Sequence, residues 1–246
     1  MKYSLIVSAF FIMSSCAKNH KDEKVELFDD FYKYIAYYPN DSVHQKGYYS
    51  NNEKTMLWLT YDNNGKITKA EDYSNSKEPT SFTDFSELYF SSQRVDSFIT
   101  IEIPSIWEKS NLSQNYNRLA IFTNNGDTLK KYKQHLSVML GSINDLQGMD
   151  SSTFESTYLK SIYDAHKGEV HFMVKKWYKR DKFYVSYSFT ANNLTIVEHD
   201  FIFFVGDKMY YFFGSSVPDT NADVYKYFDI FNSMFYSIKY NGKSIF

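Results

Sequence analysis

The sequence predicts an α+β fold: an α-β-α sandwich around a central, mainly antiparallel sheet of about six or seven strands, preceded by a helix and a small β-hairpin unit. Three observations predict the sandwich. Four strand-like segments follow one another with only tight turns between them, two of these segments are apolar on both faces, and an amphipathic helix flanks the group on each side. Strands joined by two-residue turns pair antiparallel. A strand that is apolar at consecutive positions is covered on both faces, so helices are expected on both sides of the sheet.

The four strands lie in the second half of the chain, where β-branched and aromatic residues are frequent. Residues 201–205 and 209–213 are apolar without interruption, which indicates that both faces of these two strands are buried. Strands are therefore expected at residues 169–178, 183–190, 195–205 and 208–215, with turns at 180–181, 192–193 and 206–207.

A helix is predicted on each side of these strands. Before them, Ser152 and Glu155 have the spacing of a capping box, and a helical stripe of apolar residues follows. After them, a terminal helix starts near Asp219 and Thr220. The first stripe consists of Phe154, Tyr158, Leu159, Ile162 and Ala165, and the second of Val224, Phe228, Phe231 and Phe235.

Three further strands are expected before the first helix, at residues 95–103, 119–122 and 134–143. The first of them belongs to the segment DSFITIEIPSIWEK, which ends in a Pro-x-x-Trp element formed by Pro104 and Trp107. This segment and the order of the strands and helices resemble the PsbP-like family over roughly residues 85–240. The resemblance implies a central antiparallel sheet between helices, in a domain that covers residues 84–246.

What the PsbP-like resemblance implies for function is a binding or assembly module. It supplies no shared set of catalytic residues, and the metal association of the photosynthetic branch finds no matching ligands in this sequence. No cofactor is therefore expected. Residues 25–83 lie outside the resemblance and form an N-terminal extension, with a helix predicted at 25–38, a hairpin at 46–75 and a linker at 74–83.

The N-terminus carries an apolar run at residues 5–13 that is too short to cross a bilayer, which takes about 20 apolar residues. Its length fits the apolar region of a secretory signal. Two serines and the only cysteine, Cys16, follow it. The arrangement resembles a bacterial lipoprotein signal with its lipobox, which implies a signal peptide at residues 1–15, a lipid on the Cys16 thiol and a polar tether at 16–24.

The lipid implies a membrane anchor in the bacterial cell envelope. Ala17 stands where an aspartate would retain such a protein at the inner membrane, so the outer membrane is expected. The sequence leaves open whether the body faces the periplasm or the outside. With the one cysteine lipidated, the fold contains no disulfide.

Composition and missing motifs argue against several classes of function. The net charge is −2, with basic and acidic residues almost balanced, so a nucleic-acid partner is not expected. The sequence contains no Gly-x-Ser-x-Gly nucleophile motif, no phosphate-binding Gly-x-x-x-x-Gly-Lys loop and no Gly-x-Gly-x-x-Gly dinucleotide motif. An enzyme is therefore not expected.

Two groups of residues are candidate sites. His166, Glu169 and His171 have residue types that bind metals, although polar side chains at an exposed strand start explain them more simply. A basic cluster with an interleaved tryptophan is a candidate contact for phosphate headgroups or an acidic partner, while a solvated hairpin tip is the simpler explanation. The cluster consists of Lys175, Lys176, Trp177, Lys179 and Arg180.

The function that these observations favour is a lipid-anchored, non-catalytic module of the bacterial cell envelope that binds or assembles with another protein. One alternative is a periplasmic immunity lipoprotein that neutralises a delivered toxin. Another is a carrier of a hydrophobic ligand, and a third is an envelope metal-binding protein that uses the two histidines and the glutamate.

Overall fold

The computed structural model describes residues 22–28, 30–74, 79–110, 118–124, 134–142, 150–218 and 221–246, and it describes only the backbone of residues 28 and 221–226. Within these residues the strands form three antiparallel sheets of six, seven and four strands. Two α-helices, α1 (Ser151–Ala165) and α2 (Asn221–Tyr236), and a 3-10 turn, η1 (Ser86–Leu88), accompany them. Among the helices described, none is long and apolar enough to cross a membrane.

The six-stranded sheet comes first in the chain and is an antiparallel meander in sequence order. The hairpin predicted in this region is confirmed as β4 and β5, with Gly65 at φ 78° in the turn. There the Asp62 carboxylate accepts hydrogen bonds from the backbone N–H groups of Asn64 and Lys66, each 2.9 Å long. The strands are β1 (Glu23–Phe28), β2 (Phe31–Tyr37), β3 (Val43–Ser50), β4 (Glu53–Tyr61), β5 (Ile67–Asp72) and β6 (Thr80–Ser81).

The helix predicted at residues 25–38 is wrong, because β1 and β2 occupy this segment as an antiparallel pair. Asp30 has φ 55°, the left-handed conformation of a turn, so the chain reverses in the middle of the predicted helix. On the strand that follows, Tyr32 pairs opposite Tyr49 and Lys33 opposite Tyr48 of β3. Aromatic residues favour strands when such cross-strand partners are present, and here they override the helical spacing.

The seven-stranded sheet has the order β12-β13-β14-β15-β11-β10-β9. The predicted four-strand meander is confirmed as β12 to β15, and the strands predicted at 119–122 and 134–143 are confirmed as β10 and β11. Asn192 and Asn193 both have positive φ in the tight turn between β13 and β14. The strands are β9 (Glu108–Lys109), β10 (Arg118–Asn124), β11 (Gln134–Ser142), β12 (Val170–Tyr178), β13 (Lys182–Ala191), β14 (Leu194–Val205) and β15 (Lys208–Ser216).

A four-stranded sheet, in the order β17-β16-β8-β7, takes in the strand that the sequence predicts at 95–103. That strand begins only at Ile99, because the Asp96 carboxylate accepts hydrogen bonds from the backbone N–H groups of Phe98 and Ile99 and closes a turn there, each 2.7 Å long. It belongs to this separate sheet and not to the central one. The strands are β7 (Phe90–Arg94), β8 (Ile99–Pro104), β16 (Lys239–Tyr240) and β17 (Lys243–Ser244).

The two helices predicted before and after the four-strand meander are present, but α1 begins at a different residue from the one predicted. Its N-cap is Asp150, whose Oδ1 accepts a 2.7 Å hydrogen bond from the backbone N–H of Thr153. Ser152, the predicted cap, lies inside the helix. Aspartate caps a helix as well as serine does, and the negative charge also suits the helix N-terminus.

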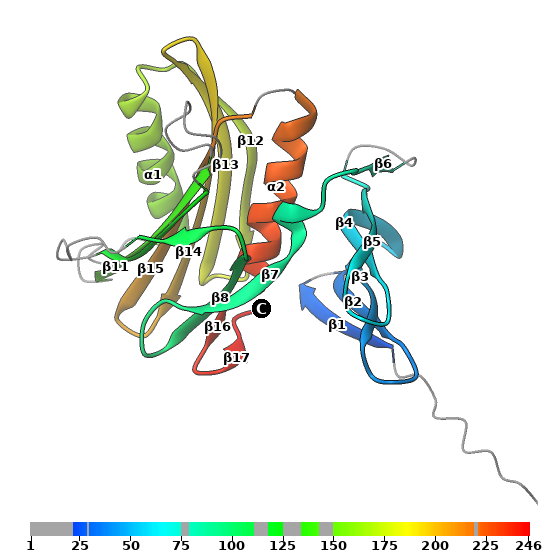
Figure 1. Ribbon diagram of the computed structural model, residues 1–246. Helices are drawn as coiled ribbons and strands as arrows, with labels where there is room; N and C mark the ends of the chain where they lie inside the picture. The colour runs from blue at the N-terminus through cyan, green and yellow to red at the C-terminus, as the bar shows by residue number, and fades with distance from the viewer. Residues whose placement is uncertain are drawn as a thin grey trace, which may run out of the picture.

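The two helices cover opposite faces of the seven-stranded sheet, as Figure 1 shows, and the predicted combination of a mainly antiparallel sheet with two helices is confirmed. Alternate residues of β13 divide between these faces: Phe183 and Val185 pack with α1, and Tyr184 packs with α2. We call them the α1 face and the α2 face.

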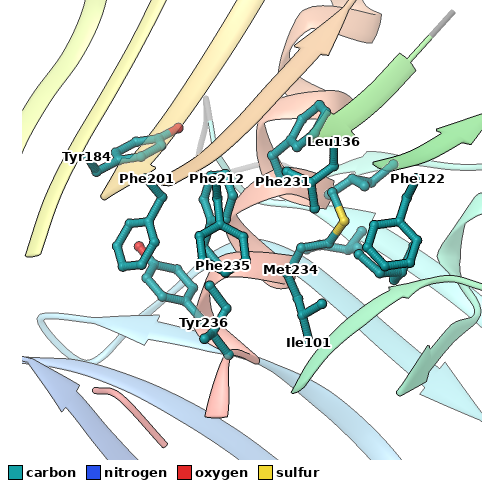
Figure 2. Packing of buried hydrophobic residues seen from close by; sticks show 14 of the residues in the cluster. Ile101, Phe122, Leu136, Tyr184, Phe201, Phe212, Phe231, Met234, Phe235 and Tyr236 are labelled. Atoms are coloured by element: carbon teal, nitrogen blue, oxygen red, sulfur yellow. The ribbon is translucent and has the colours of Figure 1, made fainter. Parts of the chain in front are cut away.

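The main core lies on the α2 face and continues into the other two sheets. Figure 2 shows α2 contributing Phe231, Met234, Phe235 and Tyr236 to it, against strand residues such as Phe201 and Ile101. The ring of Tyr236 lies 5.3 Å from that of Phe31 and 5.7 Å from that of Tyr48. The six-stranded sheet is therefore packed on the same core as the central sheet.

The close packing of α2 against β15 predicts that a substitution at Gly214 lowers the stability of the protein. An ideal Cβ at Gly214 would lie 2.4 Å from Cε1 of Phe231. We expect Gly214→Ala to lower the free energy of unfolding by about 1–3 kcal/mol, because the ring has to move within a packed core. Denaturant unfolding should show a smaller cost for the same substitution in a Phe231→Leu background. Equal costs in the two backgrounds would contradict the predicted collision.

Candidate functional site

The candidate metal ligands do not form a metal site. Among the described residues, no group of three or more His, Cys, Asp and Glu side chains is arranged to hold a metal ion. His166 caps the C-terminus of α1 and its ring lies 3.7 Å from that of Phe189, where burial lowers the pKa of the imidazole. Glu169 and His171 are exposed on either side of the start of β12. His166 thus packs against Phe189, while the other two candidates are exposed.

The basic cluster lies on β12 and in the turn that follows it, but its members do not share one face. Lys175 pairs opposite Val185 and Lys176 opposite Tyr184, so the two lysines lie on opposite faces of the sheet. Trp177 is partly buried under α1, where its Nε1 donates a 2.9 Å hydrogen bond to Glu155 of that helix. The basic side chains therefore lie on both faces of the edge strand β12 and do not form a flat basic patch.

The remaining two residues of the cluster are exposed in the turn between β12 and β13, Lys179 with φ 58° and Arg180 next to it. The neighbouring Lys182 is buried, and its Nζ lies 2.6 Å from Asp181. Cys16, the predicted lipidation site, lies outside the described residues.

A buried cluster of carboxyl groups and tyrosines lies under α1, where the sequence suggested no site. Glu198 and Asp200 are two positions apart on β14 and share the α1 face, with exposed fractions of 8% and 0%. The Tyr187 hydroxyl on β13 donates a hydrogen bond to Glu198. The Tyr158 hydroxyl on α1 lies 2.7 Å from Asp200 Oδ2 and 2.7 Å from the Tyr211 hydroxyl on β15. Residues from three strands and the helix thus meet at two acids.

Burial makes both acids hold their protons more strongly than in water. It raises the pKa of Glu198 to about 7, with the hydrogen bond from Tyr187 acting in the opposite direction. Burial raises the pKa of Asp200 well above its ordinary value, and the nearby Glu198 charge adds to this rise. Among the described residues, no cation forms an ion pair with either carboxyl group. Glu198 can therefore take up and release a proton near neutral pH.

One oxygen of this cluster has no partner. Asp200 Oδ1 is buried and accepts no hydrogen bond from any described group. A buried ionised carboxylate with an unsatisfied oxygen is costly, whereas a neutral carboxylic acid loses much less. The Tyr158 hydroxyl has a single proton, so it accepts one of its two hydrogen bonds and donates the other. The Tyr158 hydroxyl can donate to Asp200 Oδ2 while it accepts from the Tyr211 hydroxyl, so this contact fits either state of the acid. The feature that favours the protonated acid is the buried, unsatisfied Oδ1.

His199 lies between the two acids in sequence but on the opposite face of the sheet. Its Nδ1 lies 3.1 Å from the Tyr184 hydroxyl, and its ring stacks on Phe231 of α2 at 4.7 Å. Complete burial lowers the pKa of His199 to about 3, so the imidazole is neutral at physiological pH. Because it is on the α2 face, it cannot exchange protons directly with Glu198 or Asp200.

A second pair of acids joins the six-stranded sheet to α2. The Ser74 hydroxyl lies 2.9 Å from each carboxyl oxygen of Asp229, and the Ser74 backbone N–H donates a 2.7 Å bond to Asp72. Burial raises the pKa of Asp229 well above its ordinary value, and the nearby Asp72 charge adds to this rise. These contacts fix the position of α2 against β5, and they are separate from the cluster under α1.

No family model matches the chain, and no curated protein matches it. The chain is similar to the cyanobacterial PsbP protein CyanoP from Synechocystis sp. PCC 6803, with 13% identity and a TM-score of 0.44, over 64% of this chain and 95% of that one.

Two other solved structures are similar over comparable lengths. The Saccharomyces cerevisiae Ran-binding protein Mog1p has 11% identity and a TM-score of 0.44, over 62% of this chain and 97% of that one. LpqN, involved in cell envelope biogenesis of Mycobacterium tuberculosis, has 10% identity and a TM-score of 0.38, over 62% of this chain and 90% of that one. The named roles of the three proteins differ, so the likeness singles out no function for this chain.

Proposed function

We propose that this chain is a lipid-anchored, non-catalytic module of the bacterial cell envelope that binds an extended segment of a partner protein at the outer edge of β12. Cys16 is the anchor, and the outer membrane is the membrane that carries it. The observation on which the binding function rests is the open edge of the central sheet.

Strand β12 is nine residues long and is the first strand of the seven-stranded sheet, paired within the described residues only with β13. The backbone N–H and C=O groups along its other edge can pair with an added strand. Many peptide-binding domains recognise extended partners in this way, with main-chain hydrogen bonds supplying affinity and side chains supplying specificity.

The charges on β12 favour an acidic partner that lies in the plane of the sheet. Lys175 and Lys176 are exposed on opposite faces of this strand, and Lys179 and Arg180 are exposed at its end. A strand that pairs with this edge lies in the plane of the sheet. Lys175 can then contact it from one face of the sheet and Lys176 from the other. A membrane surface would contact one face only, so this arrangement supports a peptide over phosphate headgroups. Charge complementarity of this kind raises the association rate and selects the partner.

We expect a photoreactive amino acid at His171, on β12, to cross-link the full-length chain in cells to an acidic, extended segment of an envelope protein. The paired charge reversal Lys175→Glu and Lys176→Glu should reduce that product about tenfold or more, because like charges then face the partner. The measurement is the yield of the cross-linked product and the mapping of its peptide by mass spectrometry.

Two controls make the result specific. The same photoreactive group at Tyr163, which is exposed on α1, should give none of this product. Reversing the exposed Lys66 and Lys243 to glutamate changes the net charge equally, away from β12, and should leave the yield unchanged. A yield that is unaffected by the charges on β12, or no product at His171, contradicts the proposal. In that case the edge lysines only guard the strand against aggregation.

A further inference from the structure

Helix α1 covers a small hydrophobic core that is separate from the main one. On the α1 face, Phe154 and Ile162 of the helix pack with Phe183, Val185 and Ile202 of the sheet. Those two are the only buried residues of α1, and no member of the main core comes from this helix. Displacing α1 would therefore leave the packing of α2 and the three sheets in place.

Besides the bond from Trp177 to Glu155, a second polar contact holds α1 on this core, and it ends on a buried acid. Tyr158 is the helix residue that reaches Asp200 and Tyr211, and Glu198 lies next to them on the same face. No described lysine or arginine compensates the acids if they ionise. Ionisation would place two negative charges, two positions apart on one strand, beneath the helix in a dry site.

We infer that α1 is a proton-operated cover, which is held on the sheet while Glu198 and Asp200 are protonated and is loosened when they ionise. Loosening uncovers an aromatic surface of the sheet. Its residues are Phe172, Phe183, Val185, Tyr187, Ile202 and Phe204.

The raised pKa of Glu198 sets the direction in which pH changes the docking of α1. Glu198 has an ordinary pKa of 4.5 and a pKa of about 7 under the docked helix. The docked state is therefore favoured fully below pH 4.5, and docking weakens as the pH rises to 7. Between these values the opening constant, the ratio of undocked to docked helix, grows about tenfold per pH unit. Glu198 alone accounts for an increase of about 80-fold over this interval and of about 300-fold over its whole titration.

The other ionisable groups around the acids do not supply this effect. Tyr158, Tyr187 and Tyr211 have raised pKa values through burial, so they stay neutral through this range. His166 at the end of α1 and His135 on β11 have pKa values lowered by burial. The charged Lys160 and Asp164 form a pair on the exposed side of α1, and Lys175 lies at the sheet edge beside Phe172.

The test is amide hydrogen exchange of the full chain in detergent, corrected for intrinsic rates, from pH 5 to pH 8. We expect the amides of α1 to exchange through an opening that leaves residues 227–236 of α2 protected. The titration of Glu198 alone should raise the opening constant of α1 about 40-fold from pH 5 to pH 7. The substitution Glu198→Gln should remove the contribution of Glu198 and reduce the slope of the α1 profile, and the double variant with Asp200→Asn should make the profile nearly flat over this range.

A matched control is Asp164→Asn, which removes an exposed acid from the same helix and should leave the α1 profile as in the wild type. Asp200→Asn, which removes the other buried acid and should also reduce the slope, is the second test variant in case Glu198→Gln does not fold. Equal opening constants for α1 and α2 at every pH would overturn the inference, since α1 would then open only with the whole protein. An unchanged slope in the folded variants would overturn it as well.

Discussion

A Cys16→Ser chain is expected to leave the membrane fraction almost completely and to appear in the soluble fraction of fractionated cells. A serine hydroxyl is far less nucleophilic than a cysteine thiol, so it is not expected to take up the lipid that the lipobox resemblance implies. Each buried methylene of an acyl chain contributes about 0.8 kcal/mol, and two or three chains together make attachment effectively permanent. Losing them removes the anchor, and no helix of the described residues is able to span the membrane in its place.

The matching control is Ser14→Ala, which replaces one small residue before the cysteine by another and should keep the protein in the membrane fraction. The mass of the wild-type protein should exceed that of its chain from Cys16 onward by the attached acyl groups. If the serine variant sediments with membranes as the wild type does, the lipid anchor is ruled out, and with it the envelope location that we propose.

The second half of the fold was predictable because its signals are local. Turn residues with positive φ, such as Asn192 and Asn193, mark the ends of the strands in the meander. Continuous apolar runs in β14 and β15 require cover on both faces, and α1 and α2 supply it. These signals fix the element order and the layers without any knowledge of long-range contacts.

The N-terminal sheet was not predictable to the same degree. Phe31, Tyr32 and Ile35 fit a helical spacing with the residues before them, and the deciding contacts are with β3, which follows later in the chain. An aromatic residue in a strand is stabilised by the residue opposite it, and sequence periodicity does not contain that information. The turn at Asp30 was hidden among acidic residues that also suit a helix surface.

The acidic cluster was missed for a related reason. Tyr187 meets Glu198 through the register of β13 with β14, and Tyr158 reaches Asp200 only because α1 lies across that face. The one sequence signal available was a pair of acidic residues at alternate positions of a mostly apolar strand. Alternation places Glu198 and Asp200 on a single face that the neighbouring apolar residues require to be covered.

The largest loss of stability is expected from Phe235→Ala in α2. Phe235 is 1% exposed, its ring stacks on Phe201 at 5.3 Å, and the rings of Tyr184 and Phe212 lie around it at 5.9 and 6.5 Å. Removing a buried phenyl ring costs its transfer free energy and leaves a cavity between the helix and the sheet. We expect the free energy of unfolding to fall by about 3–5 kcal/mol, measured by denaturant titration.

The contrast with Phe154→Ala tests whether the two cores are separate. Phe154 is also buried, but it belongs to the core under α1, so its loss should increase the exchange of α1 amides much more than that of α2 amides. The exposed Tyr163→Ala should change the free energy of unfolding by less than about 0.5 kcal/mol. If Phe154→Ala increases exchange in α1 and α2 to the same extent, the two cores unfold as one unit. The helix could then not act as a cover, because the energy needed to lift it would be the energy needed to unfold the protein.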